Sequence, residues 1–352
     1  MIGRCLISMA IFCCAFSALP VFGEGYREVR PGDEVTLPED LYYRPDYQVQ
    51  WWYLTGHLVD EGGREFGYEL TFFAVGVDPK VHQSQFGLNT IFISHFAVSD
   101  IGGQRFTFDD ESDRGAYGFA GAHEQRLAVW VGENRLEGSM SGITIKARGE
   151  ESRLYLSLVP RKPFILNGEK GYARKSEASP LAASLYFSCT RLATEGVLRL
   201  GDQEYKVTGT SWFDRELASR DLDASALGWD WFALHLDGGQ DVMLYRIRRA
   251  DGKVGAYSSG TLVYGNGKSR HLKRDDFKIT DLGHYTSKKT KARYPSQWRV
   301  VIPSEGINVT VVPRIEDQEF LAPYTTWNAY WEGACKVDGS HRGRGYVEMT
   351  GY

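Results

Sequence analysis

The sequence has no surplus of basic residues and, after its first 23 residues, no long run without charge. Its 352 residues carry 41 Lys and Arg against 45 Asp and Glu, which gives a formal net charge of −4. A protein that binds the nucleic-acid backbone needs basic residues to neutralise phosphates, so we expect no nucleic-acid partner. A membrane-spanning helix needs ~20 apolar residues in succession, and no later stretch supplies them.

The one long charge-free run lies at the start of the chain. Met1 to Arg4 brings a positive charge, Cys5 to Leu19 carries none, and small or turn-forming residues follow as far as Gly23. This order is typical of a secretory signal peptide. We therefore expect residues 1–23 to be removed, with cleavage after Gly23 or after Ala18, and the protein to be exported to the periplasm or beyond. A membrane anchor is the alternative, but the run is shorter than a span requires.

Cysteine is scarce as well. Three of the five cysteines fall in the expected signal peptide, which leaves Cys189 and Cys335. In an oxidising compartment these two could form one disulfide, and two buried free thiols are the alternative that we favour.

Common catalytic motifs are also missing. The sequence contains no G-x-S-x-G, no P-loop, no H-E-x-x-H and no C-x-x-C, and no G-x-G-x-x-G follows a predicted strand. The eight histidines are not paired at short spacing, so a metal site would need ligands from distant segments. We therefore expect neither a metal ion nor a cofactor.

Short aromatic and β-branched segments, by contrast, follow one another from Val49 onward and predict an all-β protein. Turn signals recur about every 8–12 residues, the spacing of a sandwich or a barrel. Leu217–Leu227 is the one short helical candidate. Strands are expected at Tyr68–Val75, Thr90–Val98, Arg126–Val131, Leu136–Ala147, Arg153–Val159, Ala183–Cys189, Trp231–Leu236, Asp241–Arg248, Thr261–Tyr264 and Gln297–Pro303.

An internal repeat indicates two similar domains. Trp51-Trp-Tyr-Leu-Thr-Gly-His57 resembles Trp229-Asp-Trp-Phe-Ala-Leu-His235, which lies 178 residues later, and a Gly pair follows each copy. Half of the mature chain is the size of one eight-to-ten-stranded barrel. We place the boundary in the turn-rich stretch from Gly201 to Gly209, which gives domains at 24–205 and 206–352.

The run Gly209-Thr-Ser-Trp-Phe-Asp-Arg-Glu-Leu217 is the most unusual in the sequence. On a strand, Trp212, Asp214 and Glu216 share one face and Arg215 takes the other. Two carboxyl groups beside a Trp in one cavity could keep one acid protonated, as protonation of an olefin or a carbonyl requires. The alternative is a strand end whose acids pair with Arg215, Arg220 or Arg246.

Histidine and tryptophan give less specific signals. His95 lies among apolar residues, which favours a hydrogen-bonded core residue over a proton carrier, and the equivalent repeat positions of His57 and His235 favour a structural role for at least one. The tryptophans are core residues for the most part, or they line an apolar pocket in a barrel mouth. The candidates for ligand contact are Trp52, His95, Trp212, Trp229, Trp231 and Trp331.

Eight motifs occur in an order that resembles a known family. They are Gln50-Trp-Trp-Tyr-Leu-Thr-Gly-His-Leu58, His95-Phe-Ala, Tyr186-x-Ser188-x-x-Arg191, Gly209-x-x-Trp-x-Asp-Arg-Glu216, Gly228-Trp-Asp-Trp-Phe232, Leu244-Tyr-Arg-Ile-Arg248, Tyr330-Trp-Glu-Gly333 and Gly345-Tyr-Val-Glu-Met-Thr-Gly-Tyr352. Together they resemble the family of bacterial carotenoid 1,2-hydratase (hydroxyneurosporene synthase) and the AttH-type secreted proteins, also labelled predicted secreted hydrolases. The resemblance covers Asp46 to Tyr352.

This resemblance implies two lipocalin-like β-barrel domains with a cavity for an apolar ligand. It also implies water addition to isoprenoid double bonds and, for the secreted branch, operons that encode an ABC exporter of the lipoprotein-releasing type. The chain departs from the family at Gln50, where we would expect Glu before the Trp-Trp-Tyr, and this removes one possible acid.

Three hypotheses follow. The first is a periplasmic enzyme that hydrates or hydrolyses a lipid or an isoprenoid, with Asp214 or Glu216 as general acid/base and Tyr245 or His235 assisting. The second is a non-catalytic lipid carrier or chaperone that works with the exporter. The third is a structural envelope protein whose aromatic residues are all core.

Overall fold

The computed structural model describes residues 25–80, 84, 87–219, 226–322, 325–326 and 329–352. The expected signal peptide lies outside these residues. Helix is confined, in the described chain, to 3₁₀ turns at η1 (Glu39–Leu41), η2 (Ala116–Gly118), η3 (Arg274–Asp276) and η4 (Pro303–Glu305). None of these helices is long and apolar enough to cross a membrane.

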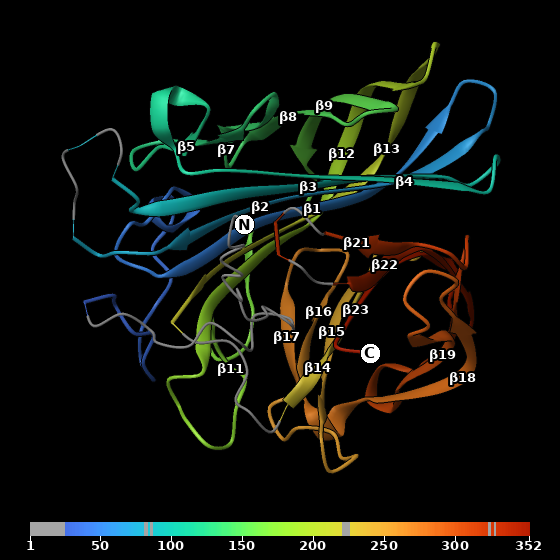
Figure 1. Ribbon diagram of the computed structural model, residues 1–352. Coiled ribbons are helices and arrows are strands. Elements are labelled where there is room, and N and C mark those ends of the chain that lie inside the picture. Colours follow the sequence, from blue (N-terminus) through green and yellow to red (C-terminus); the bar gives the residue numbers. More distant parts are fainter. Residues whose placement is uncertain (1–24, 81–83, 85–86, 220–225, 323–324, 327–328) are drawn as a thin grey trace, which may run out of the picture.

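The first half of the chain forms one antiparallel sheet of 13 strands, in the order β4-β3-β2-β1-β13-β12-β9-β8-β7-β6-β5, with β10 and β11 beside β12 (Figure 1). Its long strands β1, β2, β12 and β13 supply one wall of the site described below. The bounds are β1 (Val49–Asp60), β2 (Glu65–Gly76), β3 (Thr90–Asp100), β4 (Arg105–Asp113), β5 (Ala120–Ala122), β6 (Leu127–Val131), β7 (Asn134–Ser139), β8 (Gly142–Arg148), β9 (Ser152–Pro160), β10 (Ile165–Leu166), β11 (Tyr172–Arg174), β12 (Ala183–Leu200) and β13 (Gln203–Ala218).

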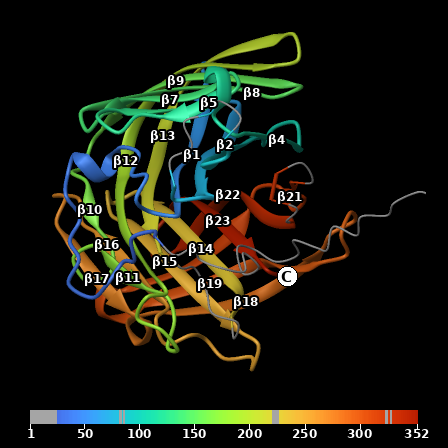
Figure 2. The same ribbon diagram turned by 60° about the vertical axis from the view of Figure 1, so that its left-hand side comes forward.

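The second half forms an antiparallel sheet of 10 strands, in the order β17-β16-β15-β14-β23-β22-β20-β19-β18, with β21 beside β22. Both sheets curl into barrel-like shapes that lie against each other (Figures 1 and 2). The all-β, two-barrel prediction is confirmed. The bounds are β14 (Ala226–Leu236), β15 (Asp241–Arg249), β16 (Ser259–Val263), β17 (Ser269–Lys273), β18 (Lys278–Thr286), β19 (Arg293–Ile302), β20 (Ile307–Pro313), β21 (Glu319–Leu321), β22 (Ala329–Gly339) and β23 (Gly343–Thr350).

Alternating sequence patterns become half-buried strands as expected. Arg153–Val159 lies in β9, along which buried and exposed residues alternate strictly from Ser152 to Val159. The expected strand at Leu136–Ala147 is two strands, β7 and β8, because a turn at Met140 and Ser141 folds the segment into a hairpin. The ends of the helical candidate Leu217–Leu227 belong to β13 and β14, and its centre lies outside the described residues.

The internal repeat corresponds to equivalent places in the two sheets. β1 lies between the strand that follows it, β2, and the last strand of its sheet, β13. In the same way β14 lies between β15 and the last strand, β23. The expected boundary after residue 205 falls inside β13, which pairs with β1 and β12 along its length. The chain passes to the second sheet only after Ala218.

Each sheet encloses its own apolar core, and a third apolar cluster lies between the sheets. Cys189 lies in the first core and Cys335 in the second, both as buried free thiols. The third cluster holds Tyr53, Trp212 and Trp231. The sheets therefore meet through large aromatic side chains.

Polar contacts also join the sheets, and three of them are made by His57, His235 and Asp241. His57 Nε2 lies 2.9 Å from the carbonyl oxygen of Gly345, and its repeat counterpart His235 reaches the carbonyl oxygen of Thr190 at 2.6 Å. Each histidine thus contacts the backbone of the opposite sheet. Asp241, fully buried on β15, makes the third contact, with cations from the first half of the chain. Its partners are Lys162 at 2.7 Å and Arg191 at 2.5 Å.

Candidate functional site

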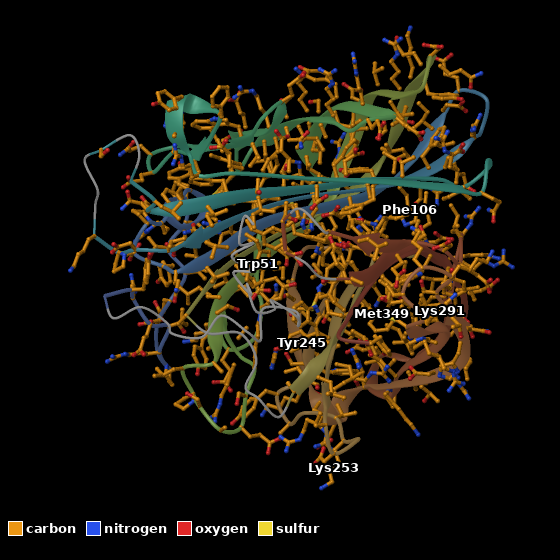
Figure 3. All side chains as sticks on the ribbon, viewed as in Figure 1. Trp51, Phe106, Tyr245, Lys253, Lys291 and Met349 are labelled. Carbon is orange, nitrogen blue, oxygen red and sulfur yellow. The ribbon has the colours of Figure 1, made fainter. Side chains whose placement is uncertain are left out.

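A cavity of about 130 Å³ lies where the two sheets meet. A cavity of this size holds one aromatic ring. Both sheets contribute to its walls, and Figure 3 labels one lining residue from each, Trp51 of β1 and Tyr245 of β15. The lining residues are Trp51, Tyr53, Thr71, Phe73, His95, Lys175, Tyr186, Asp214, Glu216, Trp229, Trp231, Tyr245, Ile247, Thr326, Ala329, Tyr330, Glu332, Glu348 and Thr350.

Asp214, on β13, is the most heavily hydrogen-bonded acid of the cavity. Trp212 Nε1 donates to its Oδ1 at 2.6 Å, Ser188 donates to the same oxygen, and the Tyr186 hydroxyl donates to Oδ2 at 2.5 Å. Among the described residues no cation pairs with this carboxyl. Asp214 is therefore a buried acid held by neutral donors alone.

Further contacts fix these donors. Asn167 donates to the Ser188 hydroxyl at 2.8 Å and accepts a hydrogen bond from Thr261. On the other side, Trp231 Nε1 donates to the Tyr186 oxygen at 3.1 Å. Because Trp231 and Thr261 belong to the second sheet, both sheets orient the Asp214 carboxyl.

The donors leave one position on Asp214 free. A carboxylate oxygen has two lone-pair sites; Oδ1 accepts two hydrogen bonds and Oδ2 accepts one. A proton can therefore reside on Oδ2. Burial raises the pKa of Asp214 to about 7, although its three hydrogen bonds act in the opposite direction. The group can thus give and take a proton near neutral pH.

Glu216, two residues further along the same face of β13, is held differently. Lys175 Nζ lies 2.6 Å from its Oε2, and Ser184 donates to the same oxygen. The Lys175 ammonium also lies over the Trp51 ring, 5.2 Å from its centroid. Glu216 is committed to an ion pair at the cavity wall, which distinguishes it from Asp214.

Two glutamates face the cavity from the second sheet. Glu332 on β22 stands directly opposite Glu348 on β23, and the Tyr53 hydroxyl donates to Glu332 from the first sheet. Burial raises the pKa of Glu348 to about 7, while burial and the charges of Glu69 and Glu348 raise the pKa of Glu332 well above its ordinary value. Two neighbouring buried carboxyl groups repel each other when both are ionised, so one of them tends to keep its proton.

Glu69 of β2 does not line the cavity, but it lies near enough to Glu332 and Glu348 to interact with their charges. Its Oε1 accepts a hydrogen bond from Thr71, which lines the cavity. Its Oε2 is buried and has no hydrogen-bond partner among the described residues. Burial raises the pKa of Glu69 well above its ordinary value. The cavity therefore has an acidic wall made by both sheets.

The repeat makes Asp214 and Glu348 counterparts. Asp214 stands opposite Tyr53 in the pairing of β1 with β13, and Glu348 stands opposite Trp231 in the pairing of β14 with β23. Tyr53 and Trp231 are equivalent positions of the repeat, 178 residues apart. Each sheet thus places one buried acid at the same position of its last strand.

His95 lies at another edge of the cavity. Its Nδ1 is 2.8 Å from the Tyr330 hydroxyl and its Nε2 is 3.1 Å from the Thr325 hydroxyl, which in turn donates to Asp110. Burial lowers the pKa of His95 to about 3, so the ring is neutral at physiological pH. His95 lines the cavity as a hydrogen-bonding group that joins the two sheets.

Six of the ten residues that the sequence suggested line the cavity: Asp214, Glu216, Tyr245, His95, Trp229 and Trp231. Four do not. Trp52 lies in the first core under Arg215, whose guanidinium carbon is 3.9 Å from the ring centroid, and Trp331 lies in the second core. Trp212 supports Asp214 from behind, and His235 contacts the Thr190 carbonyl instead of the cavity.

The expected strand faces agree with the structure, and among the described residues neither Arg215 nor Arg246 pairs with Asp214 or Glu216. Asp214 and Glu216 face the cavity, and Arg215 points to the other side of the sheet, where it donates to Gln50 Oε1 at 2.7 Å. Arg246 pairs with Asp230 and Asp281. Arg220, the third ion-pair partner considered above, lies outside the described residues.

The acids of the second sheet and two donors to Asp214, Tyr186 and Ser188, were not among the residues that the sequence suggested. Glu332 and Glu348 sit within Tyr-Trp-Glu-Gly and Tyr-Val-Glu-Met, and a single acid flanked by apolar residues in a strand is a signal of a buried carboxyl. Tyr186 and Ser188 alternate along a strand and so share a face. Their proximity to Asp214 follows only from the pairing of β12 with β13.

The cavity offers no metal centre in the part of the chain that the structure describes, where no three His, Cys, Asp or Glu side chains are grouped to hold a metal ion. Its carboxyl groups are instead bonded to hydroxyl, indole and ammonium groups.

Comparison with known proteins agrees with this architecture. A family model described as AttH-like matches residues 28–352. The crystal structure of a protein assigned to AttH from Nitrosomonas europaea is 30% identical, with a TM-score of 0.84, over 93% of this chain and 99% of that one. No curated protein matches the sequence.

Two more distant structures share the fold. Kievitone hydratase from Nectria haematococca is 15% identical, with a TM-score of 0.67, over 93% of this chain and 96% of its own. CghA, crystallised with Sch210972, is 12% identical, with a TM-score of 0.54, over 92% of this chain and 94% of its own. At these identities the likeness concerns the fold.

Proposed function

The chain belongs to the AttH-like family, and on that premise we propose that it is an acid–base enzyme of the hydratase type. Its reaction would be the addition of water to a carbon–carbon double bond of an apolar substrate, a lipid or an isoprenoid. The fold likeness to a hydratase supports this reaction class. The proposal itself depends on the residues of the cavity.

The observation that carries the proposal is the state of Asp214. It is buried beside aromatic rings, it keeps one lone-pair site on Oδ2, and burial raises its pKa to about 7. A general acid works best when its pKa is near the operating pH. Glu216, already ion-paired with Lys175, is the weaker candidate.

In the proposed reaction Asp214 delivers the proton on Oδ2 to one carbon of the double bond. The electron pair of the double bond forms the new C–H bond, which leaves a positive charge on the other carbon. Rings of Trp51, Trp231 and Tyr245 line the cavity, and aromatic faces attract positive charge. The cavity thus stabilises the cation that the first step creates.

Water then adds to the cation and must lose a proton. Glu348, the counterpart of Asp214 on the other sheet, lines the same cavity and has a pKa raised by burial to about 7. We assign it as the acceptor of this proton. Exchange with solvent afterwards returns the proton to Asp214 and completes the cycle.

The test is incubation of the purified protein with acyclic and cyclic isoprenoid alkenes in D₂O. Hydration or reversible protonation places deuterium on carbon, which mass spectrometry detects. Asp214→Asn should abolish this incorporation, while Glu195→Gln, at an exposed position of β12, should leave it unchanged. Binding of the alkenes without incorporation by the unaltered protein would favour a lipid carrier instead.

We further propose that residues 1–23 direct export, as the sequence indicates. Fractionation of cells followed by N-terminal sequencing would locate the protein and its first residue. A cytoplasmic protein that retains Met1 would contradict export.

A further inference from the structure

The cavity between the sheets carries far more acid than base. Four carboxyl groups line it, those of Asp214, Glu216, Glu332 and Glu348. Lys175 is the one cationic side chain among the described lining residues, and it is paired with Glu216 at 2.6 Å. The proposed hydration uses Asp214 and Glu348 but gives no role to Glu332 or to Glu69 behind it.

We propose that Glu332 and Glu348, with Glu69 behind them, form a subsite for positive charge. The cavity would then bind a ring-sized apolar ligand that carries an ammonium group in preference to the same ligand with a carboxylate. This inference deepens the proposed function and rests on it for its chemical meaning, since the ammonium carries the charge that a protonated substrate would carry.

The geometry of the pair is the first argument. Glu332 and Glu348 are direct cross-strand partners on β22 and β23, and both carboxyl groups face the cavity. Two ionised carboxylates at such positions repel each other, and the raised pKa of Glu332 reflects burial together with this repulsion. A bound cation would offset the repulsion and let both carboxyl groups ionise.

The unsatisfied acceptor on Glu69 is the second argument. Its Oε2 is buried and has no hydrogen-bond partner among the described residues. Glu69 is 1% exposed, so its carboxyl group is shielded from bulk solvent. An acceptor buried without a donor costs free energy, and a positive charge in the neighbouring subsite would lower that cost.

The aromatic lining is the third argument. Trp229, Trp231 and Tyr330 line the cavity with the two glutamates. Rings combined with carboxylates are a recurrent environment for organic cations, because ring faces and carboxylates both attract positive charge. An anion in the same place would meet four carboxyl groups and one cation already neutralised by Glu216.

The other groups near Glu332 and Glu348 do not remove the expected preference for a cationic ligand. They are the hydroxyl of Tyr53, which donates to Glu332, the hydroxyls of Tyr330 and Tyr346, the indole of Trp229, the carboxyls of Asp214 and Glu216, and the Lys175 ammonium. Burial raises the pKa of each of the three tyrosines well above its ordinary value, so they stay neutral.

Cation binding would also release protons. Burial raises the pKa values of Glu332, Glu348 and Glu69 in the empty protein, so part of the cluster holds protons at neutral pH. A bound cation favours the ionised carboxylates and lowers those pKa values. Benzylammonium should therefore displace protons on binding, whereas neutral benzyl alcohol should not.

The experiment compares benzylammonium, benzyl alcohol and benzoate, which share one ring and differ in charge. Affinities come from tryptophan fluorescence of the purified protein, and proton release comes from calorimetry in two buffers of different ionisation enthalpy. At pH 8 benzylammonium should bind about tenfold or more tighter than benzoate, since charges at contact distance interact by more than the 1.4 kcal/mol that tenfold represents.

Two changes should remove this preference. The double variant Glu332→Gln/Glu348→Gln should bring the two affinities within about threefold of each other, while Glu195→Gln should not alter them. In the unaltered protein, lowering the pH from about 8 to about 5 should reduce the preference, because the raised pKa values keep the cluster protonated there. This second measurement needs no variant and holds even if the double variant fails to fold.

Equal affinities for benzylammonium and benzoate at pH 8 would overturn the proposal. A preference for benzylammonium that changes neither with pH nor in the double variant would overturn it as well. Both outcomes are read from binding alone. The subsite can therefore fail while deuterium incorporation through Asp214 stands, or stand while that incorporation fails.

Discussion

Asp214 and Glu348 are counterparts in the two halves of the molecule, each on the last strand of its sheet and each facing the same cavity. The first stands opposite Tyr53 and the second opposite Trp231, which are equivalent residues of the internal repeat. Two similar sheets packed against each other thus bring two buried acids to one space. In the proposed reaction this pairing supplies both the donor and the acceptor of protons.

Removal of the Asp214 acid should abolish turnover without preventing binding. Asp214→Asn keeps the size of the side chain but cannot deliver a proton, and general acid catalysis contributes about 10²–10⁴-fold. We expect at least about a 100-fold loss of deuterium incorporation, with benzyl alcohol affinity within about twofold. Full activity in this variant, with Glu195→Gln as the control, would contradict the role of Asp214.

Removal of the Tyr186 hydroxyl, one of the hydrogen-bond donors to Asp214, should raise the pKa of Asp214. The Tyr186 hydroxyl donates to Asp214 Oδ2 at 2.5 Å and so stabilises the carboxylate. In Tyr186→Phe that support is lost, and the pKa of Asp214 should rise above about 7. The limb of the pH–rate profile that reports the acid should move to higher pH, and an unmoved or lowered limb would show that Asp214 does not set it.

Stability should fall as the pH rises. The pKa of Asp214 is raised from its ordinary 3.8 to about 7 in the folded protein, so between these values the folded state holds a proton that the unfolded state has lost. The bound proton stabilises the folded state below about pH 4. As the pH rises to about 7 this stabilisation is lost, and the free energy of unfolding falls by an amount on the order of 4 kcal/mol. Glu348 acts in the same direction.

Urea unfolding at several pH values checks this sign. Asp214→Asn does not titrate at this position, so its free energy of unfolding should decline less steeply between about pH 4 and pH 7 than that of the unaltered protein. The comparison cancels the titrating groups that do not interact with Asp214. A variant with the same or a steeper decline would contradict the raised pKa.

The junction of the sheets should depend on Asp241. This carboxylate is fully buried between Lys162 at 2.7 Å and Arg191 at 2.5 Å, and Thr190 donates to it at 2.9 Å. Asp241→Asn leaves two cations without their counter-charge, which should cost about 3–5 kcal/mol of unfolding free energy. Thermal unfolding measures the loss, and the exposed control Asp251→Asn should show little change.

Much of the fold could be predicted from the sequence because strands carry their pattern locally. Arg153–Val159 alternates in sequence and in burial alike. The repeat of Trp51–His57 at Trp229–His235 indicated two similar halves, and their equivalent places in the two sheets agree with this. The boundary between the halves was harder to predict, since most of the turn-rich stretch from Gly201 to Gly209 belongs to β13, which pairs with β1.

The site was predicted only in part, for a physical reason. The run Trp212-Phe-Asp-Arg-Glu216 showed which residues share a face, and Asp214 and Glu216 do face the cavity. The acids opposite them come from β22 and β23, more than a hundred residues away, and no local pattern links those strands to β13. The same limit applies to Trp52 and Trp331, which fill the two cores.

The most direct test of the account is an infrared titration of the carboxyl groups, with Asp214→Asn as the reference. The account predicts that the difference spectrum, unaltered protein minus variant, contains the carbonyl band of one protonated acid, which disappears with a midpoint at about pH 7. The bands of Glu348 and the other buried glutamates are present in both proteins. A difference spectrum without that band, or a midpoint near the ordinary 3.8, would show that Asp214 is ionised at neutral pH and is not the acid of the proposed reaction.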